Sequence, residues 1–399
     1  STRVRSSAAS DVYKRQVKRG CVGNKQCKKN VKQKKYLRMK IVVTGTRGIP
    51  EIQGGVETHC QELYPRLAAL GHDVTVICRS PYVTPRHPKE YRGVKLAIVK
   101  APHRKSFEAI VHTWRAIRMA KRLKADVVHI HAIGPALLTP FARLMGLRVV
   151  NTNHGPDYDR KKWGPMAKLM LRTGERLGAR YANEVIVISQ VIANILAEKY
   201  QRTDTNLIFN GVNKPQMPQA DDYIKSLGLE PQRYVVALGR FVEEKGFDDL
   251  IAAWKLLNQR DYKLVIAGDA DIEDAYSRSL KKKAAEAGVV LTGFIRGEKL
   301  QQIMGHAALF AMPSYHEGLP IALLEAMSYG LDVAVSSIPA NRLPQLRADD
   351  FFEAGDARGI ASVLKRKFAA PERRIYDLSP YDWDFIARQT EGVYRKAVQ

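Results

Sequence analysis

From residue 39 onward, short runs of β-branched and apolar residues alternate with longer stretches that have the apolar spacing of helices. A chain that alternates strands and helices in this way forms parallel strands joined by helical crossovers. The sequence therefore predicts an α/β fold with doubly wound, mostly parallel sheets. The expected strands of a first series are residues 40–45, 73–79, 94–99, 126–131, 148–152, 184–189 and 206–209.

This alternation is interrupted at residues 210–218, where an Asn-Gly pair and two prolines follow the last strand of the first series. The second series is expected to have strands at 234–238, 263–268, 289–293, 308–312, 333–336 and 351–353. We therefore predict two Rossmann-like halves, with a ligand crevice between them at the carboxyl ends of the strands. A final amphipathic helix is expected within residues 379–399, with one apolar stripe formed by Trp383, Ile386, Val393 and Ala397.

Residues 1–38 differ from the rest of the chain because they are polar, strongly basic and without hydrophobic periodicity. They contain 13 Lys and Arg residues and one acid, and so carry +12 of the formal charge of +25. The segment SSAASDVYKRQ within them reads as a translated sequencing adaptor. We expect residues 1–38 to be a non-native or disordered leader and Met39 to be the biological start.

The remaining charge of +13 suggests an anionic partner, such as a nucleotide, a lipid phosphate or an acidic membrane surface. No recognised nucleic-acid-binding module accompanies it, so nucleic acid is not expected as a partner. No apolar run approaches the roughly 18 residues that a membrane span needs, which argues against an integral membrane protein. Outside the leader only Cys60 and Cys78 remain, without metal or disulfide spacing, and this fits a reducing compartment.

The stretch AMPSYHEGLPIALLEAMSYG, residues 311–330, predicts a strand, a turn and a helix. Pro320 suits the first turn of that helix, where its missing N–H is not needed, so the amides of Gly318 and Leu319 should point outward and attract an anion. Glu317 lies just before the helix and Glu325 within it. Two carboxylates beside an anion site make chemical sense if the ligand also carries hydroxyl groups.

A second strand-to-helix turn, residues 239–246 with the sequence GRFVEEKG, follows the expected strand at 234–238. Its two cations, Arg240 and Lys245, come at the carboxyl end of that strand. Arginine and lysine in this position could clamp a diphosphate without a metal ion, because both donate charge-assisted hydrogen bonds to phosphate oxygens.

The Glu-x7-Glu spacing of Glu317 and Glu325, together with Arg240 and Lys245, resembles the motifs of family 4 (group 1) glycosyltransferases. The similarity extends over nearly all of residues 39–399. It implies a GT-B fold with an acceptor-side domain at 39–213, a nucleotide-sugar-binding domain at 214–378, and a helix at 379–399 that crosses back to the first domain. The sequence RGIP followed by GGVETHCQELYPRL resembles a bacterial subgroup often described as rhamnosyltransferase-like.

The first half contributes a glycine-rich turn and a histidine. The turn contains Gly54 and Gly55 but lacks the spacing of a dinucleotide site, and the resemblance implies instead that it faces the donor diphosphate and the acceptor. His154 ends a strand and precedes a glycine, and its counterpart in the family contacts the transferred sugar. His129 and His131 alternate with apolar residues in VVHIHA, which favours structural or at most pocket-lining roles.

Two basic segments need separate interpretations. Arg115, Arg118 and Arg122 share a helical face near Lys121 and Lys124, which is best explained as a solvated surface. The segment RKKW at residues 160–163 follows the His154 loop, and cations beside a tryptophan could contact an anionic membrane that carries a lipid-linked acceptor.

The resemblance implies a metal-independent, retaining hexosyl- or deoxyhexosyltransferase that moves a sugar from a nucleotide diphosphate sugar to an acceptor hydroxyl in cell-surface polysaccharide, lipopolysaccharide or glycolipid assembly. It needs no cofactor, and a cytoplasmic location at the inner face of the cell membrane is expected. Arg240 and Lys245 would stabilise the departing diphosphate, and Glu325 would hold the ribose. Glu317, the Gly318 and Leu319 amides and Pro320 would form the donor loop, and His154 would contact the sugar from the other domain.

Two other functions remain open at this point. A sugar-nucleotide epimerase can share the architecture, although it would not be expected to combine the Glu-x7-Glu loop with the Arg-Lys clamp. A non-catalytic partner in a polysaccharide assembly complex could bind the nucleotide sugar without turnover. One departure from the family is Leu331-Asp332, where a Pro-Val pair is usual, and an acid there is expected to weaken the packing of a buried strand.

Overall fold

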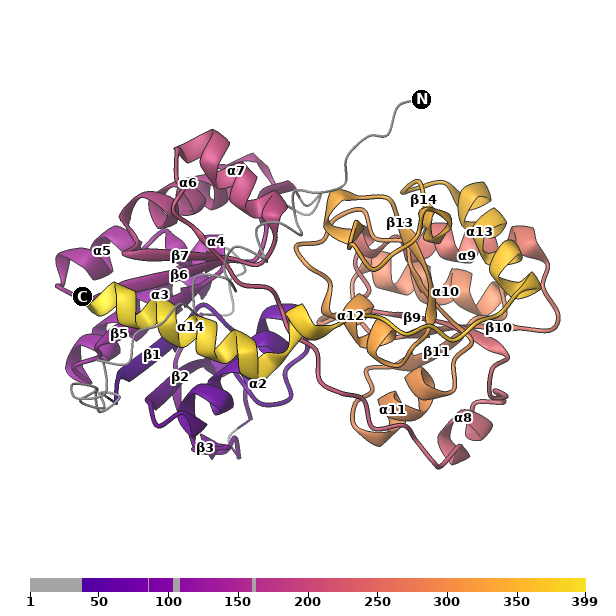
Figure 1. Cartoon of the computed structure of the whole chain (residues 1–399), viewed down its shortest axis with the longest axis horizontal. Coiled ribbons are helices and arrows are strands. Elements are labelled where there is room, and N and C mark those ends of the chain that lie inside the picture. The colour runs from indigo at the N-terminus through magenta and orange to yellow at the C-terminus, as the bar shows by residue number, and fades with distance from the viewer. Residues whose placement is uncertain (1–37, 85, 103–107, 160–162) are drawn as a thin grey trace, which may run out of the picture. The chain divides into compact units, whose positions relative to one another are not determined.

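Two almost entirely parallel sheets, one from each half of the sequence, organise this protein (Figure 1). The computed structural model describes residues 38–84, 86–102, 108–159 and 163–399. Contacts divide the chain into residues 1–38 and Met39–Gln399. The predictions about a leader therefore lie outside the described residues.

The first sheet has the strand order β3-β4-β2-β1-β5-β6-β7-β8. A strand is present at each of the expected places, although three of them end one or two residues earlier than expected. One additional short strand pairs antiparallel with β4 through a two-residue turn at Arg92 and Gly93, both with positive φ. The strands are β1 (Lys40–Thr44), β2 (Asp73–Arg79), β3 (Glu90–Tyr91), β4 (Val94–Val99), β5 (Val127–His131), β6 (Val149–Asn153), β7 (Glu184–Val187) and β8 (Asn206–Leu207).

Side-chain alternation along these strands assigns the helices to opposite faces of the sheet. Ile41 and Val43 pack with α2 (Gly55–Ala69), whereas Val42 packs with α3 (Glu108–Arg122) on the other face. The remaining helices of this half are α4 (Ile133–Ala136), α5 (Thr139–Leu144), α6 (Pro165–Tyr181) and α7 (Gln190–Tyr200). Residues of α5, α6 and α7 belong to the same core cluster as Val42, so these helices cover the face of α3.

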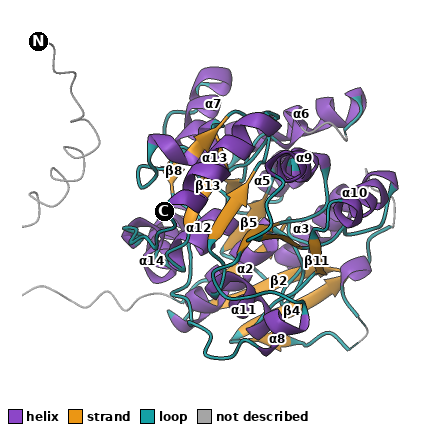
Figure 2. Cartoon of the chain, turned by 90° about the vertical axis from the view of Figure 1, so that its right-hand side faces the viewer, coloured by secondary structure: helices purple, strands orange, loops and turns teal. Residues whose placement is uncertain are grey.

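The second sheet has the order β11-β10-β9-β12-β13-β14 and is covered by helices on both faces (Figure 2). Its strands are β9 (Tyr234–Leu238), β10 (Lys263–Ala267), β11 (Val290–Gly293), β12 (Leu309–Met312), β13 (Asp332–Ser336) and β14 (Phe351–Phe352). Its helices are α8 (Asp222–Ser226), α9 (Phe247–Leu257), α10 (Ala275–Glu286), α11 (Glu298–Gly305), α12 (Ile321–Ser328) and α13 (Ala357–Ala369).

The last helix, α14 (Trp383–Val398), returns to the first half and packs along α2. The carboxylate of Asp382 caps it by accepting from the amide of Phe385 at 2.8 Å. Trp383 lies directly against Gly211, where any side chain would overlap the indole. The predicted apolar stripe is buried, and the crossing helix is confirmed.

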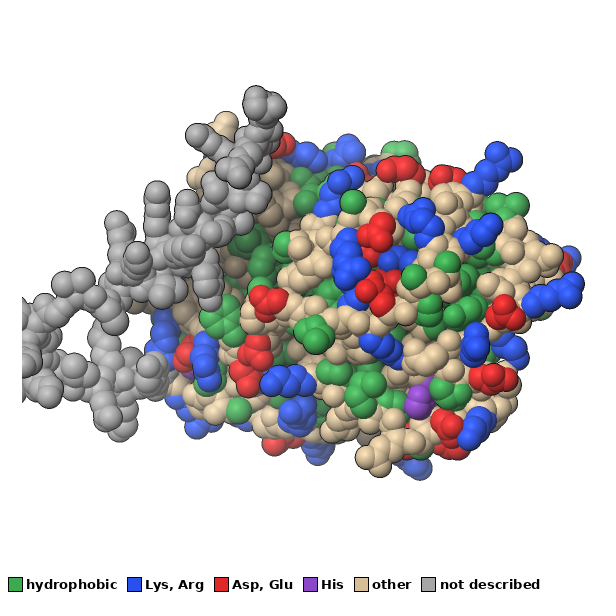
Figure 3. Space-filling view, turned by 45° about the vertical axis from the view of Figure 1, so that its right-hand side comes forward, with side chains coloured by type: hydrophobic (Ala, Val, Ile, Leu, Met, Phe, Trp, Pro, Cys, Tyr) green, Lys and Arg blue, Asp and Glu red, His purple; other side chains and the backbone are tan. Residues whose placement is uncertain are grey.

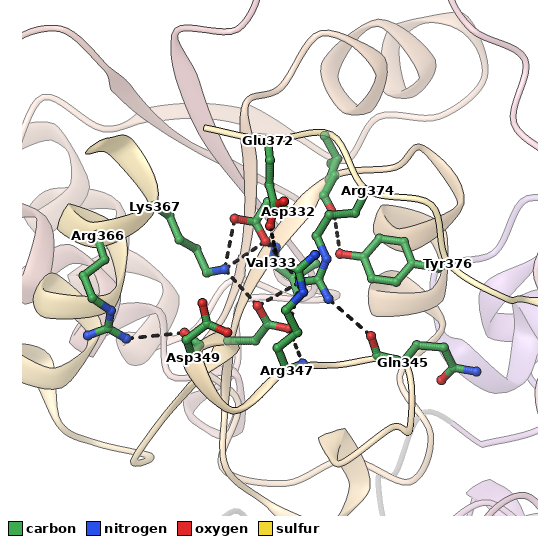
Figure 4. A network of polar contacts seen from close by, with 12 residues as sticks. Asp332, Val333, Gln345, Arg347, Asp349, Arg366, Lys367, Glu372, Arg374 and Tyr376 are labelled. Carbon is green, nitrogen blue, oxygen red and sulfur yellow. Dashed lines mark hydrogen bonds and ion pairs between the residues drawn. The ribbon is translucent and has the colours of Figure 1, made fainter. Parts of the chain in front are cut away.

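Asp332, the acid expected to weaken packing, belongs to a buried ionic network at the edge of the second sheet (Figure 4). Its carboxylate pairs with Lys367 at 2.8 Å and with Arg374 at 3.2 Å. Asp350 contacts the same two cations, each at 2.8 Å. Two acids and two cations therefore compensate one another, which offsets the expected cost of burying Asp332.

Replacing Asp350 with Ala should destabilise the protein by about 3–5 kcal/mol, because two buried cations would then share one carboxylate. Urea unfolding followed by circular dichroism measures the change in the free energy of unfolding. The matched control is Asp349→Ala, an exposed neighbour whose loss should cost about 0.5 kcal/mol or less. Equal effects of the two substitutions would show that the network contributes little to stability.

Candidate active site

The loop between β12 and α12 carries the predicted donor-binding residues of the second half. The helix begins at Ile321 with Pro320 as its N-cap, one residue later than the predicted placement of Pro320 in the first turn. The amides of Gly318 and Leu319 donate to no other described residue. The fold therefore does not use these amides within the described residues, and their role in binding a ligand stays a prediction.

Gly318 lies where this loop meets the first half. A Cβ atom at Gly318 would overlap the carbonyl oxygen of His154, and one at Gly155 would lie 3.5 Å from the Cα atom of Gly318. The loops from the ends of β6 and β12 thus meet backbone to backbone. The structure brings His154 and the Glu317–Leu319 segment together as predicted, and it shows that glycine is required for that approach.

The predicted clamp residues follow β9 and lie beside this loop. Lys245 Nζ donates to Glu317 Oε1 at 2.6 Å, so the clamp lysine and the first glutamate of the motif form an ion pair. Gly246 allows the turn because it has a φ of +66° and its hydrogen lies against the carbonyl of Pro313. Arg240 instead donates to Asp271 at 2.8 Å, a contact that the sequence analysis did not anticipate.

Glu325 lies in the second turn of α12 and is partly buried. Within the described residues its carboxylate has no hydrogen-bond or ion-pair partner. Burial raises the pKa of Glu325 to about 7, and the negative charge of Glu62 adds to the shift. A partly buried carboxylate without a partner loses hydration and gains no compensating contact in the fold. Glu325 is therefore a candidate ligand-binding group.

The glycine-rich loop between β1 and α2 is braced from within. Glu57 accepts from the amide of Arg47 at 3.0 Å and from the hydroxyl of Thr46 at 3.3 Å. Gly54 has a φ of +147°, and a side chain there would overlap the Glu57 carboxylate. A Cβ placed at Gly55 would meet no neighbouring atom within 4 Å, so this position faces open space.

His154 follows β6 and belongs to a cluster of four histidines, with His129 and His131 of β5 and His59 of α2. Its Nε2 atom and Nδ1 of His131 share a hydrogen bond of 2.9 Å, and its ring meets that of His59 edge-on at 5.2 Å. Burial holds the pKa of His154 well below its usual value, and the charges of His59 and His129 would lower it further. A histidine that is neutral near pH 7 can hydrogen-bond a sugar hydroxyl.

His129 and His131, predicted as structural or pocket-lining, are fully buried and link His154 to the crossover helix. Tyr64 contacts both rings through its hydroxyl, which lies 2.9 Å from His129 Nδ1. Tyr394 of α14 lies 2.6 Å from the same nitrogen. The alternation in VVHIHA placed both rings on one face of the strand, but only the fold supplied the tyrosines.

Asn210 was not singled out from the sequence, although it lies in the segment that joins the halves. Its Oδ1 atom is 3.0 Å from His59 Nδ1, and its Nδ2 donates to the carbonyl of Leu319 at 2.8 Å. One buried amide therefore holds the donor loop against the histidine cluster. The Asn-Gly pair indicated a turn and gave no sign of this role.

Two further ion pairs join the halves near the glycine-rich loop. Arg47 donates to both carboxylate oxygens of Asp271, at 3.1 and 3.0 Å. Arg296 pairs with Glu51 at 2.9 Å. Among the described residues, no three acids, histidines or cysteines converge as metal ligands would, and metal independence stays a prediction.

Comparisons with known proteins identify the family. A family model described as Glycosyltransferase Family 4 matches residues 53–214, and one described as Glycosyl transferases group 1 matches residues 219–343. A GDP-mannose:cellobiosyl-diphosphopolyprenol alpha-mannosyltransferase of Xanthomonas oryzae pv. oryzae is 31% identical over 283 residues, which is 67% of this chain and 69% of that protein. The chain belongs to the group 1 glycosyltransferases.

Two other similarities extend over most of this glycosyltransferase. An uncharacterized glycosyltransferase of Methanocaldococcus jannaschii is 25% identical over 399 residues, covering 90% of this chain and 99% of that protein. The structure of sucrose-phosphate synthase from Thermosynechococcus elongatus has a TM-score of 0.76 at 21% identity, covering 90% of this chain and 98% of that one. The predicted GT-B fold is confirmed, while the rhamnosyltransferase-like subgroup and the domain boundaries stay predictions.

The two family matches divide the site residues of the glycosyltransferase between them. Gly54, Gly55 and His154 fall in the first match, and the clamp with both glutamates falls in the second. Their individual roles stay predictions. In the described part of the chain no helix combines the length and the apolar character needed to cross a bilayer.

The substitution Glu325→Gln should stabilise the glycosyltransferase at pH 8 by roughly 1–3 kcal/mol. In the unfolded chain Glu325 releases its proton near pH 4.5. In the folded chain the raised pKa lets it keep the proton until about pH 7. Stability is therefore lost as the pH rises through this window, and the variant should match the wild type near pH 5. Urea unfolding at both pH values tests this, with Glu286→Gln as an exposed control. A gain at pH 5 as large as at pH 8 would contradict the proposed titration.

Proposed function

We propose that this protein is a metal-independent, retaining glycosyltransferase that transfers a hexosyl or deoxyhexosyl group from a nucleotide diphosphate sugar to an acceptor hydroxyl. The observation that carries the proposal is the meeting of the His154 loop with the donor loop at Gly318, beside the Lys245–Glu317 pair. The ion pair lies next to the Gly318 and Leu319 amides, and this proximity supports a site for a charged, hydroxyl-bearing ligand. The GDP-mannose donor of the Xanthomonas relative supports a nucleotide sugar here as well.

In such a reaction negative charge develops on the departing diphosphate, and the enzyme must stabilise it. Lys245, Arg240 and the amides of Gly318 and Leu319 are the groups that would stabilise its developing charge. Glu325 would accept hydrogen bonds from the ribose hydroxyls, for which its partly buried, unpartnered carboxylate is suited. The open space at Gly55 would let the glycine-rich loop approach the diphosphate and the acceptor.

Glu317 would orient the sugar rather than attack it. Its carboxylate is held by Lys245 at 2.6 Å, and an ammonium ion at that distance reduces the nucleophilicity of the oxygen. His154 would receive or donate a hydrogen bond at a sugar hydroxyl from the opposite half. Burial holds its pKa well below the usual value, which favours a neutral imidazole over a cationic acid near neutral pH.

The acceptor is proposed to be lipid-linked, at the inner face of the cell membrane in cell-envelope polysaccharide or glycolipid assembly. The Xanthomonas relative carries a diphosphopolyprenol acceptor in its name. On this chain, the exposed face of α6 begins with Met166 and Leu169 and continues with Arg172, Arg176 and Arg180. The only acid of that helix, Glu175, is buried.

The neighbouring helices extend this apolar and basic surface. Leu144 of α5 is 86% exposed, and Trp114 of α3 stacks on Phe141 while remaining partly exposed. The exposed cations of α3 are Arg115, Arg118, Lys121 and Arg122. By contrast, the face shown in Figure 3 intersperses Lys and Arg with Asp and Glu. Of the RKKW segment, residues 160–162 lie outside the described residues, and Trp163 packs beside Tyr158 instead of being exposed.

Incubation of the full chain with a panel of UDP-, GDP-, ADP- and dTDP-sugars, with and without a crude lipid-linked acceptor, tests the transferase. We expect release of one nucleoside diphosphate, reduced about 10²–10³-fold by Lys245→Ala and by Glu325→Ala, because each substitution removes a group that binds the donor. Lys255→Ala, an exposed lysine on α9, is the matched control and should retain full activity. Donor binding without release would favour a non-catalytic partner. The absence of both donor binding and release would refute the assignment.

Binding of the full chain to vesicles tests the membrane contact. We expect co-sedimentation with phosphatidylglycerol vesicles and little with phosphatidylcholine alone, because each basic residue near an anionic surface adds about 1 kcal/mol. The double substitution Arg176→Glu and Arg180→Glu should reduce binding at least tenfold. The control is the double substitution Arg278→Glu and Lys282→Glu at exposed positions of α10, which makes the same charge change. Both variants keep the basic residues 1–38, so these residues contribute equally to both measurements. Equal losses in both variants would count against a specific face.

A further inference from the structure

Two arginines from opposite halves converge on one carboxylate next to the glycine-rich loop. Arg47 lies in the glycine-rich loop of the first half, and Arg240 follows β9 in the second. Arg47 Nη2 and Arg240 Nη1 both donate to Oδ2 of Asp271, at 3.0 and 2.8 Å, while Arg47 Nη1 donates to Oδ1 at 3.1 Å. A single anionic oxygen therefore accepts hydrogen bonds from both guanidinium groups.

This arrangement marks a position that requires an anion. Two guanidinium groups that share one acceptor atom would repel each other without a negative charge between them. Burial alone would raise the pKa of Asp271, but the hydrogen bonds and charges of Arg47 and Arg240 outweigh it and hold that pKa below its usual value. The carboxylate is thus ionised and serves as the counter-ion of both arginines.

The two sides of the contact differ in how firmly the fold holds them. The backbone of Arg47 is fixed by the bond from its amide to Glu57, and its guanidinium lies over the ring of Tyr82 at 4.9 Å. Asp271 lies in the exposed loop between β10 and α10, next to Ile272, which is 73% exposed. Arg47 is therefore preorganised, whereas the carboxylate sits on an exposed segment that can move away at little cost in buried area.

We propose that Arg47 is a phosphate-binding residue that joins Arg240 in holding a phosphoryl group, and that Asp271 occupies the position of that group as an internal counter-ion. The chemistry fits because the planar guanidinium fork binds carboxylate and phosphate oxygens in the same bidentate geometry. A phosphoryl group carries more acceptor oxygens than a carboxylate and can satisfy both arginines at once. The inference rests on the proposed function, since Arg240 is one of the proposed donor-binding residues.

The phosphoryl group has two chemically equivalent sources. It can belong to the diphosphate of the donor, which Arg240 is proposed to hold, or to a phosphate of the acceptor, since the glycine-rich loop is proposed to approach the acceptor as well. In either case Asp271 competes with the ligand, so its removal should strengthen phosphate binding while removal of Arg47 weakens it. These opposite signs distinguish the proposal from a structural ion pair, for which both substitutions would be neutral or harmful.

Isothermal titration calorimetry with the full chain measures the dissociation constants of UDP, GDP, ADP and inorganic pyrophosphate. For the nucleotide that the wild type binds, Arg47→Gln should raise the dissociation constant about tenfold or more, because it removes a charge-assisted hydrogen bond. Arg47→Lys should have an intermediate effect, because it keeps the charge and loses the fork. Asp271→Asn should lower the constant about three- to tenfold.

Arg296→Gln is the matched control, because Arg296 also joins the halves near this loop but contacts Glu51 instead of Arg240. The dissociation constant of this variant for the nucleotide should stay within twofold of the wild-type value. Urea unfolding of each variant confirms that all of them fold.

The source of the phosphate follows from a second titration. If Arg47→Gln weakens nucleotide binding, the group belongs to the donor. If nucleotide binding is unchanged but pyrophosphate binding to the nucleotide-saturated protein is lost, it belongs to the acceptor. The inference is overturned, and the proposed function stands, if the wild type binds a nucleotide and both variants leave every dissociation constant within twofold of the wild type. The two variants are Arg47→Gln and Asp271→Asn. A wild type that binds no nucleotide at all would instead overturn the proposed function.

Discussion

The backbone contact between the His154 loop and Gly318 is the constraint on which the candidate site depends. A side chain at Gly318 would overlap the carbonyl of His154, so the two halves can meet there only because the residue is glycine. Asn210 reinforces this contact by binding both His59 and the carbonyl of Leu319. Neither half therefore carries a complete site, and the histidine of one sheet is set against the glutamates and cations of the other.

The ion pairs of this protein fall into two classes that differ in exposure. In the network around Asp332, the Asp350 and Lys367 side chains are 0% and 8% exposed. At the candidate site, Asp271 is 29% and Arg47 21% exposed. A fully buried pair cannot change partners without leaving an uncompensated charge, whereas a partly hydrated pair can. The first class suits a permanent role in the fold, and the second suits groups that exchange a protein carboxylate for a ligand.

The uncharged groups of the site follow the same logic. Burial keeps the four clustered histidines neutral, and hydrogen bonds to Tyr64, Tyr394 and Asn210 fix the rings of His129, His131 and His59 in place. His154 is the member of the cluster that reaches the junction of the two halves. Glu325, by contrast, remains a partly buried carboxylate without a described partner, at a cost in stability that a binding role would explain.

The sequence alone determined the two-domain α/β fold, the amphipathic last helix and the residues of the Glu-x7-Glu and Arg-Lys motifs, because strand alternation, helical stripes and motif spacing are local properties of the chain. That this helix crosses back to the first domain was implied only by the family resemblance. The sequence also indicated that His154 ends a strand. Only the tertiary structure decided that Asn210 holds the donor loop, that Asp332 is compensated by Lys367 and Arg374, and that Asp271 joins Arg47 to Arg240. The Arg47–Asp271 contact, for example, joins residues 224 positions apart. No local pattern specifies such a pair, because it depends on how two independently formed sheets bring their carboxyl ends together.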